Sequence, residues 1–207
     1  MRVLALLLAL LVAACTPKAV HRPQGAPTAQ KPVLPIPEDE DRPEEEGDRE
    51  ELERRAAARI PYNQGLALAE SGDYPGAILE FRAAIERDEE LAAAHYNLGL
   101  VYRRTGDLDR AEESLARAAS LEPDRADYQS ALGLDLYELG RRREAEKSFR
   151  RALDIDPKHL PSLYALARLL SEDGREEEAR RFWRSYLQLS PGGPRAEEAR
   201  EHLKERP

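Results

Sequence analysis

The chain has 207 residues, a formal net charge of −8 at pH 7 and a single cysteine. The acidic balance argues against nucleic acid as a partner, because phosphate binding requires clustered Lys and Arg, and against a helix lying on an anionic lipid surface. A lone cysteine excludes an internal disulfide.

The first predicted element, residues 1–14, has the composition of a secretory signal peptide. Met1-Arg2 gives a short positive start, and the run from Val3 to Ala14 is apolar. A positive start followed by an apolar stretch and small residues is typical of these signals. The run holds 12 residues, whereas a membrane-spanning helix needs about 20.

The segment Val12-Ala13-Ala14-Cys15 resembles a bacterial lipobox. The resemblance implies that a peptidase cleaves before Cys15 and that its thiol carries diacylglycerol, so that acyl chains such as palmitate anchor the protein. Two or three chains on one residue hold firmly, since each buried methylene contributes about 0.8 kcal/mol. Thr16 follows, and by resemblance to Gram-negative lipoproteins the absence of Asp there favours the periplasmic face of the outer membrane. The alternative is an ordinary secretory signal with an incidental cysteine.

Residues 15–56 are predicted to be the lipidated cysteine and a disordered tether. Seven of the 15 prolines lie in residues 17–43, and 11 acidic residues lie in residues 38–53. A segment with so few large apolar side chains cannot bury enough surface to offset the entropy of ordering. It is either a spacer that crosses the layer next to the membrane or an unselected linker. Past Arg49 the sequence favours helix and leads into the first repeat.

A pattern that returns every 34 residues predicts the fold of residues 57–207. Four units fit, each reading as two amphipathic helices joined by a turn: residues 58–91, 92–125, 126–159 and 160–193. A fixed period of this length indicates a helical repeat array. Unit positions 8 and 20 hold Gly or Ala, which lets the two helices approach closely. Position 24 holds large side chains that fill the space between units, namely Phe81, Leu115, Phe149 and Trp183.

Leu98-Gly99, Tyr102, Ala111 and Pro123 in the second unit carry the clearest copy of the pattern. It closely resembles the tetratricopeptide repeat (TPR), with its W-x2-L-G-x2-Y…A-x3-F…P outline. The resemblance implies an all-α fold, a TPR helical-hairpin solenoid of about four repeats. Residues 194–206 read as one more helix, placed to cap the apolar face of the last unit.

The TPR resemblance also implies a concave groove lined by the first helix of each unit, with unit positions 2, 5, 9 and 12 pointing into it. These positions predict a tyrosine row beside a leucine row, with arginines nearby and asparagines that could bond a peptide backbone. The predicted partner-binding residues are Tyr62, Asn63, Leu66, Tyr96, Asn97, Leu100, Arg103, Leu134, Tyr137, Tyr164 and Arg168. Such a wall suits an apolar or amphipathic peptide. The alternative is that the array curls tightly and these side chains pack on each other.

The sequence predicts no catalytic, metal or cofactor site. The four histidines, His21, His95, His159 and His202, have no metal-ligand spacing. No phosphate-cradling glycine loop is present, because each repeat glycine has a turn or packing role. We therefore expect neither an enzyme, nor a cofactor, nor a small-molecule substrate.

Together, these features predict a lipid-anchored adaptor of the bacterial envelope that binds another envelope protein or a peptide segment of it. The layout is similar to the pilotin lipoproteins of type IV pili, which implies help in assembling a pilus or secretion complex. Those proteins usually have more repeats and little tether. The alternatives are a TPR lipoprotein that regulates or scaffolds peptidoglycan enzymes, and a structural role through self-association of the array ends.

Overall fold

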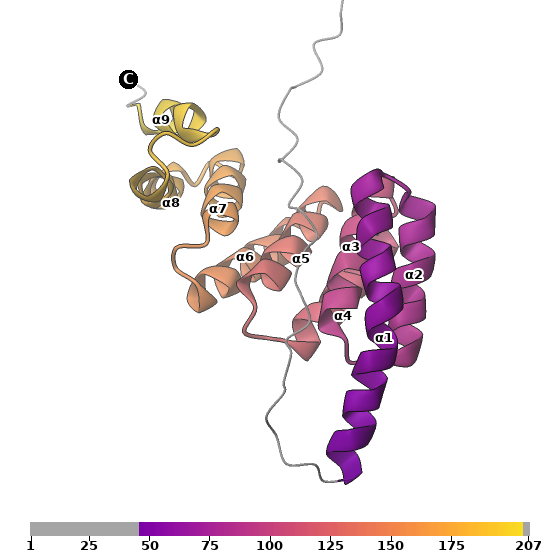
Figure 1. Cartoon of the computed structure of the whole chain (residues 1–207). Coiled ribbons are helices and arrows are strands. Elements are labelled where there is room, and N and C mark those ends of the chain that lie inside the picture. Colours follow the sequence, from indigo (N-terminus) through magenta and orange to yellow (C-terminus); the bar gives the residue numbers. More distant parts are fainter. Residues whose placement is uncertain (1–45, 205–207) are drawn as a thin grey trace, which may run out of the picture. The chain divides into compact units, whose positions relative to one another are not determined.

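The computed structural model describes residues 46–204, within which all regular structure is α-helical (Figure 1). The signal peptide, Cys15 and the first part of the predicted tether lie outside the described residues. The helices are α1 (Glu46–Ser71), α2 (Tyr74–Arg87), α3 (Ala92–Thr105), α4 (Leu108–Leu121), α5 (Ala126–Glu138), α6 (Arg142–Ile155), α7 (Leu160–Glu172), α8 (Glu176–Leu189) and α9 (Ala196–Leu203).

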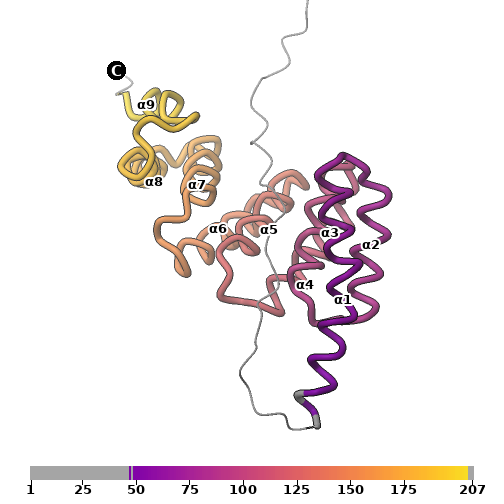
Figure 2. Tube along the Cα trace, in the orientation of Figure 1, coloured from indigo at the N-terminus to yellow at the C-terminus, as the bar shows by residue number. Residues whose placement is uncertain are grey.

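Consecutive helices pair as hairpins, and consecutive hairpins stack. The pairs are α1 with α2, α3 with α4, α5 with α6 and α7 with α8, and each hairpin also contacts the first helix of the next (Figure 2). The first helices α1, α3, α5 and α7 contact one another in succession; we call them the inner row, and α2, α4, α6 and α8 the outer row. The predicted all-α solenoid of four hairpins is confirmed.

The turn inside each hairpin depends on a glycine. Gly72, Gly106, Gly140 and Gly174 have φ between 74° and 86°, a left-handed conformation that costs free energy for any residue with a Cβ. In the first two hairpins an aspartate then caps the next helix, since Asp73 accepts from the Gly76 amide and Asp107 from the Arg110 amide. These local signals recur every 34 residues and make the hairpin period readable from the sequence.

Small and large side chains interlock inside each hairpin. A Cβ added to Gly65 would lie 2.7 Å from Phe81, and one added to Gly133 would lie 2.6 Å from Phe149. Phe81 and Phe149 are buried at 0% and 1% exposure. In the first three hairpins the glycine of the first helix therefore leaves the space that the large residue of the second helix fills.

Helix α1 begins earlier than the sequence predicts. It starts at Glu46, so residues 46–56, which we assigned to the disordered tether, are helical. Ion pairs at the helical i, i+4 spacing support this first part, with Arg49 lying 3.3 Å from Glu53 and Arg55 pairing with Glu51. Acidic residues near a helix start are also favourable to the helix dipole. The acidic run therefore belongs partly to the helix and not wholly to the tether.

The C-terminal helix α9 covers the last hairpin, as predicted. Ala196 and Ala199 are buried, and the His202 ring stacks on Trp183 with centroids 4.9 Å apart. Tyr164 of α7 donates to Glu198 at 2.9 and 3.0 Å. Within residues 46–204 no helix combines the length and apolar character that crossing a bilayer requires.

Candidate partner-binding surfaces

Five of the predicted groove residues are buried in the structure. Tyr62, Tyr96, Asn97, Leu100 and Tyr164 have 8% exposure or less. The other six keep accessible surface on the inner row: Asn63 is exposed, and Leu66, Arg103, Leu134, Tyr137 and Arg168 are partly buried. The sequence therefore placed the right helices on this face but overestimated how much of it a partner can reach.

The tyrosine row is part of the packing between helices. The Tyr96 and Tyr128 rings lie 4.7 Å apart, and the Tyr164 ring packs edge-on against Trp183 at 5.5 Å. Burial raises the pKa of Tyr96 to about 12, so its hydroxyl stays neutral. These side chains therefore pack on each other, as in the alternative that the sequence left open. The predicted accessible tyrosine wall is wrong for them.

Asn97 is also committed within the fold. Its Nδ2 donates to the Tyr62 hydroxyl at 3.0 Å and to the Ala93 carbonyl at 2.9 Å. The buried amide thus links α3 to α1, whereas the sequence predicted a contact to a peptide backbone. Its Oδ1 is buried and has no hydrogen-bond partner among the described residues.

At the α5–α7 junction the inner row pairs its own polar groups. The Tyr137 hydroxyl donates to Glu172 at 2.6 and 2.8 Å, and Arg142 and Arg168 donate to the same carboxylate at 3.0 and 2.9 Å. Burial alone would raise the pKa of Glu172, but these hydrogen bonds lower it below the usual range. Tyr137 and Arg168 are therefore engaged with the protein itself.

At the α3–α5 junction two buried polar groups are unpaired. Asp135 is fully buried, and neither carboxylate oxygen has a hydrogen-bond partner among the described residues. Arg103 Nη1 is likewise buried without a partner. Burial raises the pKa of Asp135 to about 7, opposed by the charge of Arg103 and reinforced by Glu138. An unpaired buried carboxylate costs free energy, so this junction is the most unusual place on the inner row.

The sequence analysis missed Asp135 and Glu138, although a signal was present. Unit position 10 holds Val101, Asp135 and Leu169 in successive units. Val101 and Leu169 are buried apolar side chains. Asp135 is a carboxylate at a position where the neighbouring units have apolar residues. This difference was the signal in the sequence that pointed to the junction.

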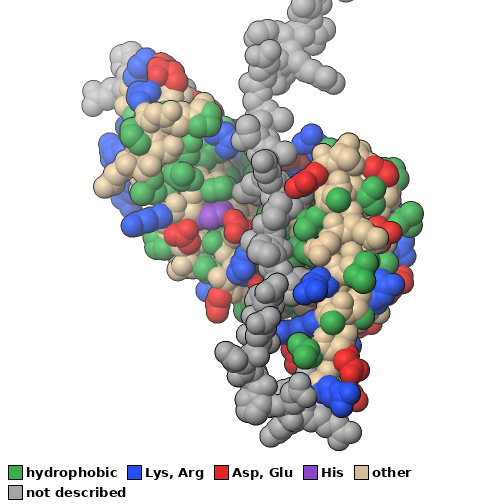
Figure 3. Space-filling view, viewed as in Figure 1, with side chains coloured by type: hydrophobic (Ala, Val, Ile, Leu, Met, Phe, Trp, Pro, Cys, Tyr) green, Lys and Arg blue, Asp and Glu red, His purple; other side chains and the backbone are tan. Residues whose placement is uncertain are grey.

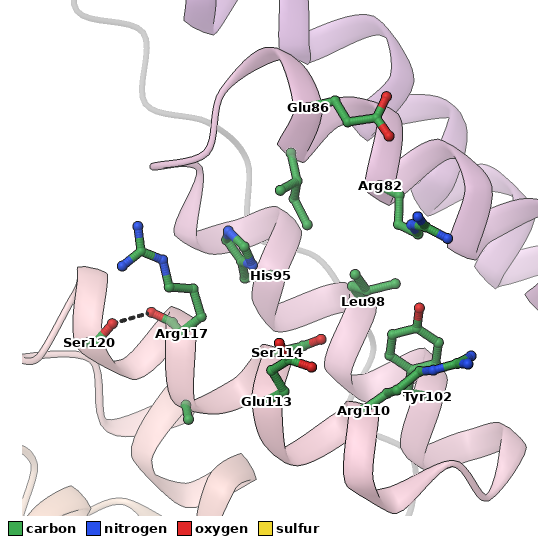
Figure 4. A pocket seen from close by; sticks show the side chains of 12 residues that line it. Arg82, Glu86, His95, Leu98, Tyr102, Arg110, Glu113, Ser114, Arg117 and Ser120 are labelled. Atoms are coloured by element: carbon green, nitrogen blue, oxygen red, sulfur yellow. Dashed lines mark hydrogen bonds between the residues drawn. The ribbon is translucent and has the colours of Figure 1, made fainter.

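A groove opens on the other side of the array, between α2 and α4 (Figure 4). It has a volume of about 990 Å³, and residues of α3 form its floor, among them Leu98 and Tyr102. Arg82 and Glu86 of α2 line one wall, and charged residues of α4 line the other. No residue of this groove was among the predicted contacts.

The described surface carries charges of both signs. On the face shown in Figure 3, basic and acidic side chains are interspersed, with no broad area of one sign outside the grey atoms. In the described part of the chain, no cluster of three or more His, Asp or Glu side chains could hold a metal ion. The His159 ring hydrogen-bonds Ser162 at 2.8 Å and Asp127 at 3.1 Å at the start of α7, which is a structural role.

Three family profiles match this chain, and all describe the same repeat. Profiles described as "Tetratricopeptide repeat" match residues 90–158 and 130–194, and one described as "TPR repeat" matches residues 65–106. A search of curated proteins gave no match.

Solved structures give the same result for the fold. PilF of Pseudomonas aeruginosa aligns at 23% identity with a TM-score of 0.66, over 73% of this chain and 69% of that one. YrrB, titled a TPR protein with an unusual peptide-binding site, aligns at 20% with a TM-score of 0.61, over 77% and 88%. The first TPR of Spaghetti (RPAP3), bound to the HSP90 peptide SRMEEVD, aligns at 20% with a TM-score of 0.56, over 58% and 95%. At such identities the similarity is one of fold.

Proposed function

Since residues 65–194 form a tetratricopeptide-repeat array, we propose that this protein is an adaptor of the bacterial cell envelope. Held to a membrane through Cys15, it binds a segment of another envelope protein along the inner row. Repeat arrays of this kind offer extended surfaces to partners. Two of the structural neighbours carry peptide binding in their titles, which supports the same use here.

The observation that carries the binding proposal is the surface that the inner row leaves accessible. Asn63 is exposed, and Leu66, Arg103 and Leu134 are only partly buried. Asp135 is fully buried, so it is not itself a contact for a partner. Polar and apolar side chains on the same row suit an amphipathic segment.

The place of the adaptor rests on the first residues of the chain. The lipobox-like segment ending at Cys15 supports a lipid anchor, and Thr16 favours the periplasmic face of the outer membrane. The layout of signal, lipobox-like segment, tether and repeat array resembles the pilotin lipoproteins of type IV pili, which favours a partner in a pilus or secretion complex over an enzyme of the cell wall.

Photo-crosslinking in envelope fractions tests the partner. A photoreactive residue at Asn63, which is exposed on the inner row, is compared with one at Arg184, which is exposed on α8. A secretin crosslinked at Asn63 alone supports the proposal. A peptidoglycan enzyme crosslinked there would replace the pilus role by the cell-wall role, and self-crosslinks alone would contradict the adaptor.

Matched substitutions separate binding from folding. Leu66→Glu with Leu134→Glu should reduce the crosslink at Asn63 at least about tenfold, since apolar anchors dominate such interfaces. Leu79→Glu is the control, because Leu79 is 66% exposed on α2 and should leave the crosslink unchanged. Circular dichroism checks that all variants keep their helices.

Metabolic labelling tests the anchor separately. A palmitate analogue should label the full chain and should not label the Cys15→Ala variant. Equal labelling of the two would refute lipidation at Cys15 without bearing on partner binding.

A further inference from the structure

Neighbouring hairpins of the outer row are joined by ion pairs that follow the repeat. Between α6 and α8, Arg150 pairs with Glu178, and Glu146 pairs with Arg175 at 2.7 Å. Between α4 and α6, Glu112 pairs with Arg141 at 2.5 Å. These pairs join residues 28 or 29 apart, so the same positions can be compared in every seam.

The seam between α2 and α4 has no such pair. The positions of Arg150 and Glu178 are taken there by Arg82 and Arg110, two residues of like charge. The positions of Glu146 and Arg175 are taken by Ile78 and Asp107. Two like charges at such a site repel. At this position the α2–α4 seam therefore has no carboxylate that does what Glu178 does for Arg150 between α6 and α8.

The groove of about 990 Å³ opens at this seam. In Figure 4, Arg82 and Arg110 lie toward the same end of the groove, together with the Tyr102 side chain. Arg110 lies over the Tyr102 ring at 5.7 Å and pairs with Asp107 at 3.3 Å. Arg82 is exposed, and within residues 46–204 no ion pair involves it.

The apolar floor of the groove and two glutamates near the arginines set what else an occupant needs. Ile85 is partly buried and offers apolar surface, and Leu98, which is 6% exposed, forms the base on which Ile85 packs. Glu86 and Glu113 also line the groove, so a uniformly acidic chain would be repelled. The surface therefore fits a segment with a single carboxylate next to a large apolar side chain.

We propose that the α2–α4 groove is a second docking surface, distinct from the inner row, that takes an acidic–apolar segment of a partner protein. The partner's carboxylate lies between Arg82 and Arg110, where Glu178 lies beside Arg150 in the α6–α8 seam. Its apolar side chain rests on Ile85, above the buried Leu98. The partner's carboxylate thus makes the contact that Glu178 makes with Arg150 between α6 and α8.

The test uses the full chain and a defined probe. An alanine-rich helical peptide carrying leucine and glutamate one turn apart is titrated, and the same peptide with glutamine in place of glutamate is the comparison. Binding is followed by fluorescence anisotropy. Because charge-assisted contacts are stronger than neutral ones, the glutamate peptide should bind about tenfold more tightly, a difference of about 1.4 kcal/mol.

Variants locate the effect. Arg82→Gln with Arg110→Gln should bring the two peptides to within about twofold of each other. Arg184→Gln is the matched control, since Arg184 is exposed on the outer row away from the groove. Arg110→Glu should also remove the preference, because it supplies the missing carboxylate from within the chain.

Three results would overturn the proposal. The first is equal binding of the glutamate and glutamine peptides to the unaltered chain, and the second is a preference that persists in the double variant. The third is failure of the glutamate peptide to bind at all, as expected if the chain's own acidic segment or a second copy fills the groove. Circular dichroism confirms that each variant remains folded.

Discussion

The two halves of the array share one packing scheme but differ in how they treat polar groups. In the second half, from α5 to α9, carboxylates and arginines of neighbouring hairpins pair on both rows, as at Glu172 and Glu178. In the first half, aligning the units places Arg110 where Arg82 would need a carboxylate, and Arg103 Nη1 of α3 is buried without a partner among the described residues. The difference teaches that the small and large packing residues determine the fold, while the charged residues determine where surface remains for a partner.

The energetics agree with this division. Exposed ion pairs are each worth about 0–1 kcal/mol, whereas buried aromatic side chains contribute several. The first half can therefore leave its pairs open at little cost in stability. Asp135 of α5, in the second half, is different, because its burial without a partner is costly.

The largest expected effect tests whether packing is alike in the two halves. Phe81→Ala and Phe149→Ala remove equivalent side chains, each buried against a glycine of the preceding helix. Each should lower the free energy of unfolding by about 3–5 kcal/mol, because a cavity replaces an aromatic ring. Urea denaturation measures both. Leu79→Ala, at an exposed site, is the control, and a loss in only one half would show that the halves are packed differently.

The next effect concerns Asp135 and depends on pH. Burial raises its pKa from 3.8 to about 7 in the folded protein, so the folded state holds this proton more tightly than the unfolded state. The contribution of this group to the free energy of unfolding is therefore fully present below about pH 4, and it is lost as the pH rises through about 7. Asp135→Asn should therefore raise the free energy of unfolding by about 2–4 kcal/mol at pH 8 and change it little at pH 4.

The control for that effect is Asp154→Asn, which alters an exposed aspartate of α6 and should change neither value. Denaturation curves at the two pH values give the comparison. If Asp135→Asn raised the free energy of unfolding equally at pH 4 and pH 8, burial would not be raising the pKa of this carboxylate.

A smaller effect compares equivalent glutamates of the inner row. Glu172 accepts from Tyr137, Arg142 and Arg168, so Glu172→Gln should cost about 0.5–1 kcal/mol at neutral pH. Glu138 occupies the same unit position, and burial raises its pKa. Glu138→Gln should be neutral or slightly stabilising. Equal losses at both sites would mean that the α3–α5 junction is paired after all.

The smallest effect is a gain. Arg110→Glu places a carboxylate opposite Arg82, as Glu178 lies opposite Arg150. The free energy of unfolding should rise by up to about 0.5 kcal/mol, and the gain should shrink in high salt. A loss of stability in thermal melts would argue that Arg110 is needed for its contact with Tyr102.

The sequence predicts the fold well because each hairpin signal is local and repeated. Turn glycines such as Gly106 and packing residues such as Phe149 recur at the same position, so each copy supports the others. The accessibility of the tyrosine row could not be read in this way. Whether Tyr96 lines a groove or packs on Tyr128 depends on how closely α3 approaches α5, which no single unit encodes. In contrast, the unusual residues at the positions of Asp135, Arg82 and Arg110 can be recognised from the sequence once the units are aligned.

Double-mutant cycles on the two equivalent outer seams test the central claim most directly. Free energies of unfolding are measured at low salt for Arg150→Ala, Glu178→Ala and their combination, and likewise for Arg82→Ala and Arg110→Ala. The account predicts a favourable coupling of about 0.5–1 kcal/mol between Arg150 and Glu178, and a zero or unfavourable coupling between Arg82 and Arg110. Favourable couplings of the same size in both seams would contradict it, because the first half would then be as fully paired as the second.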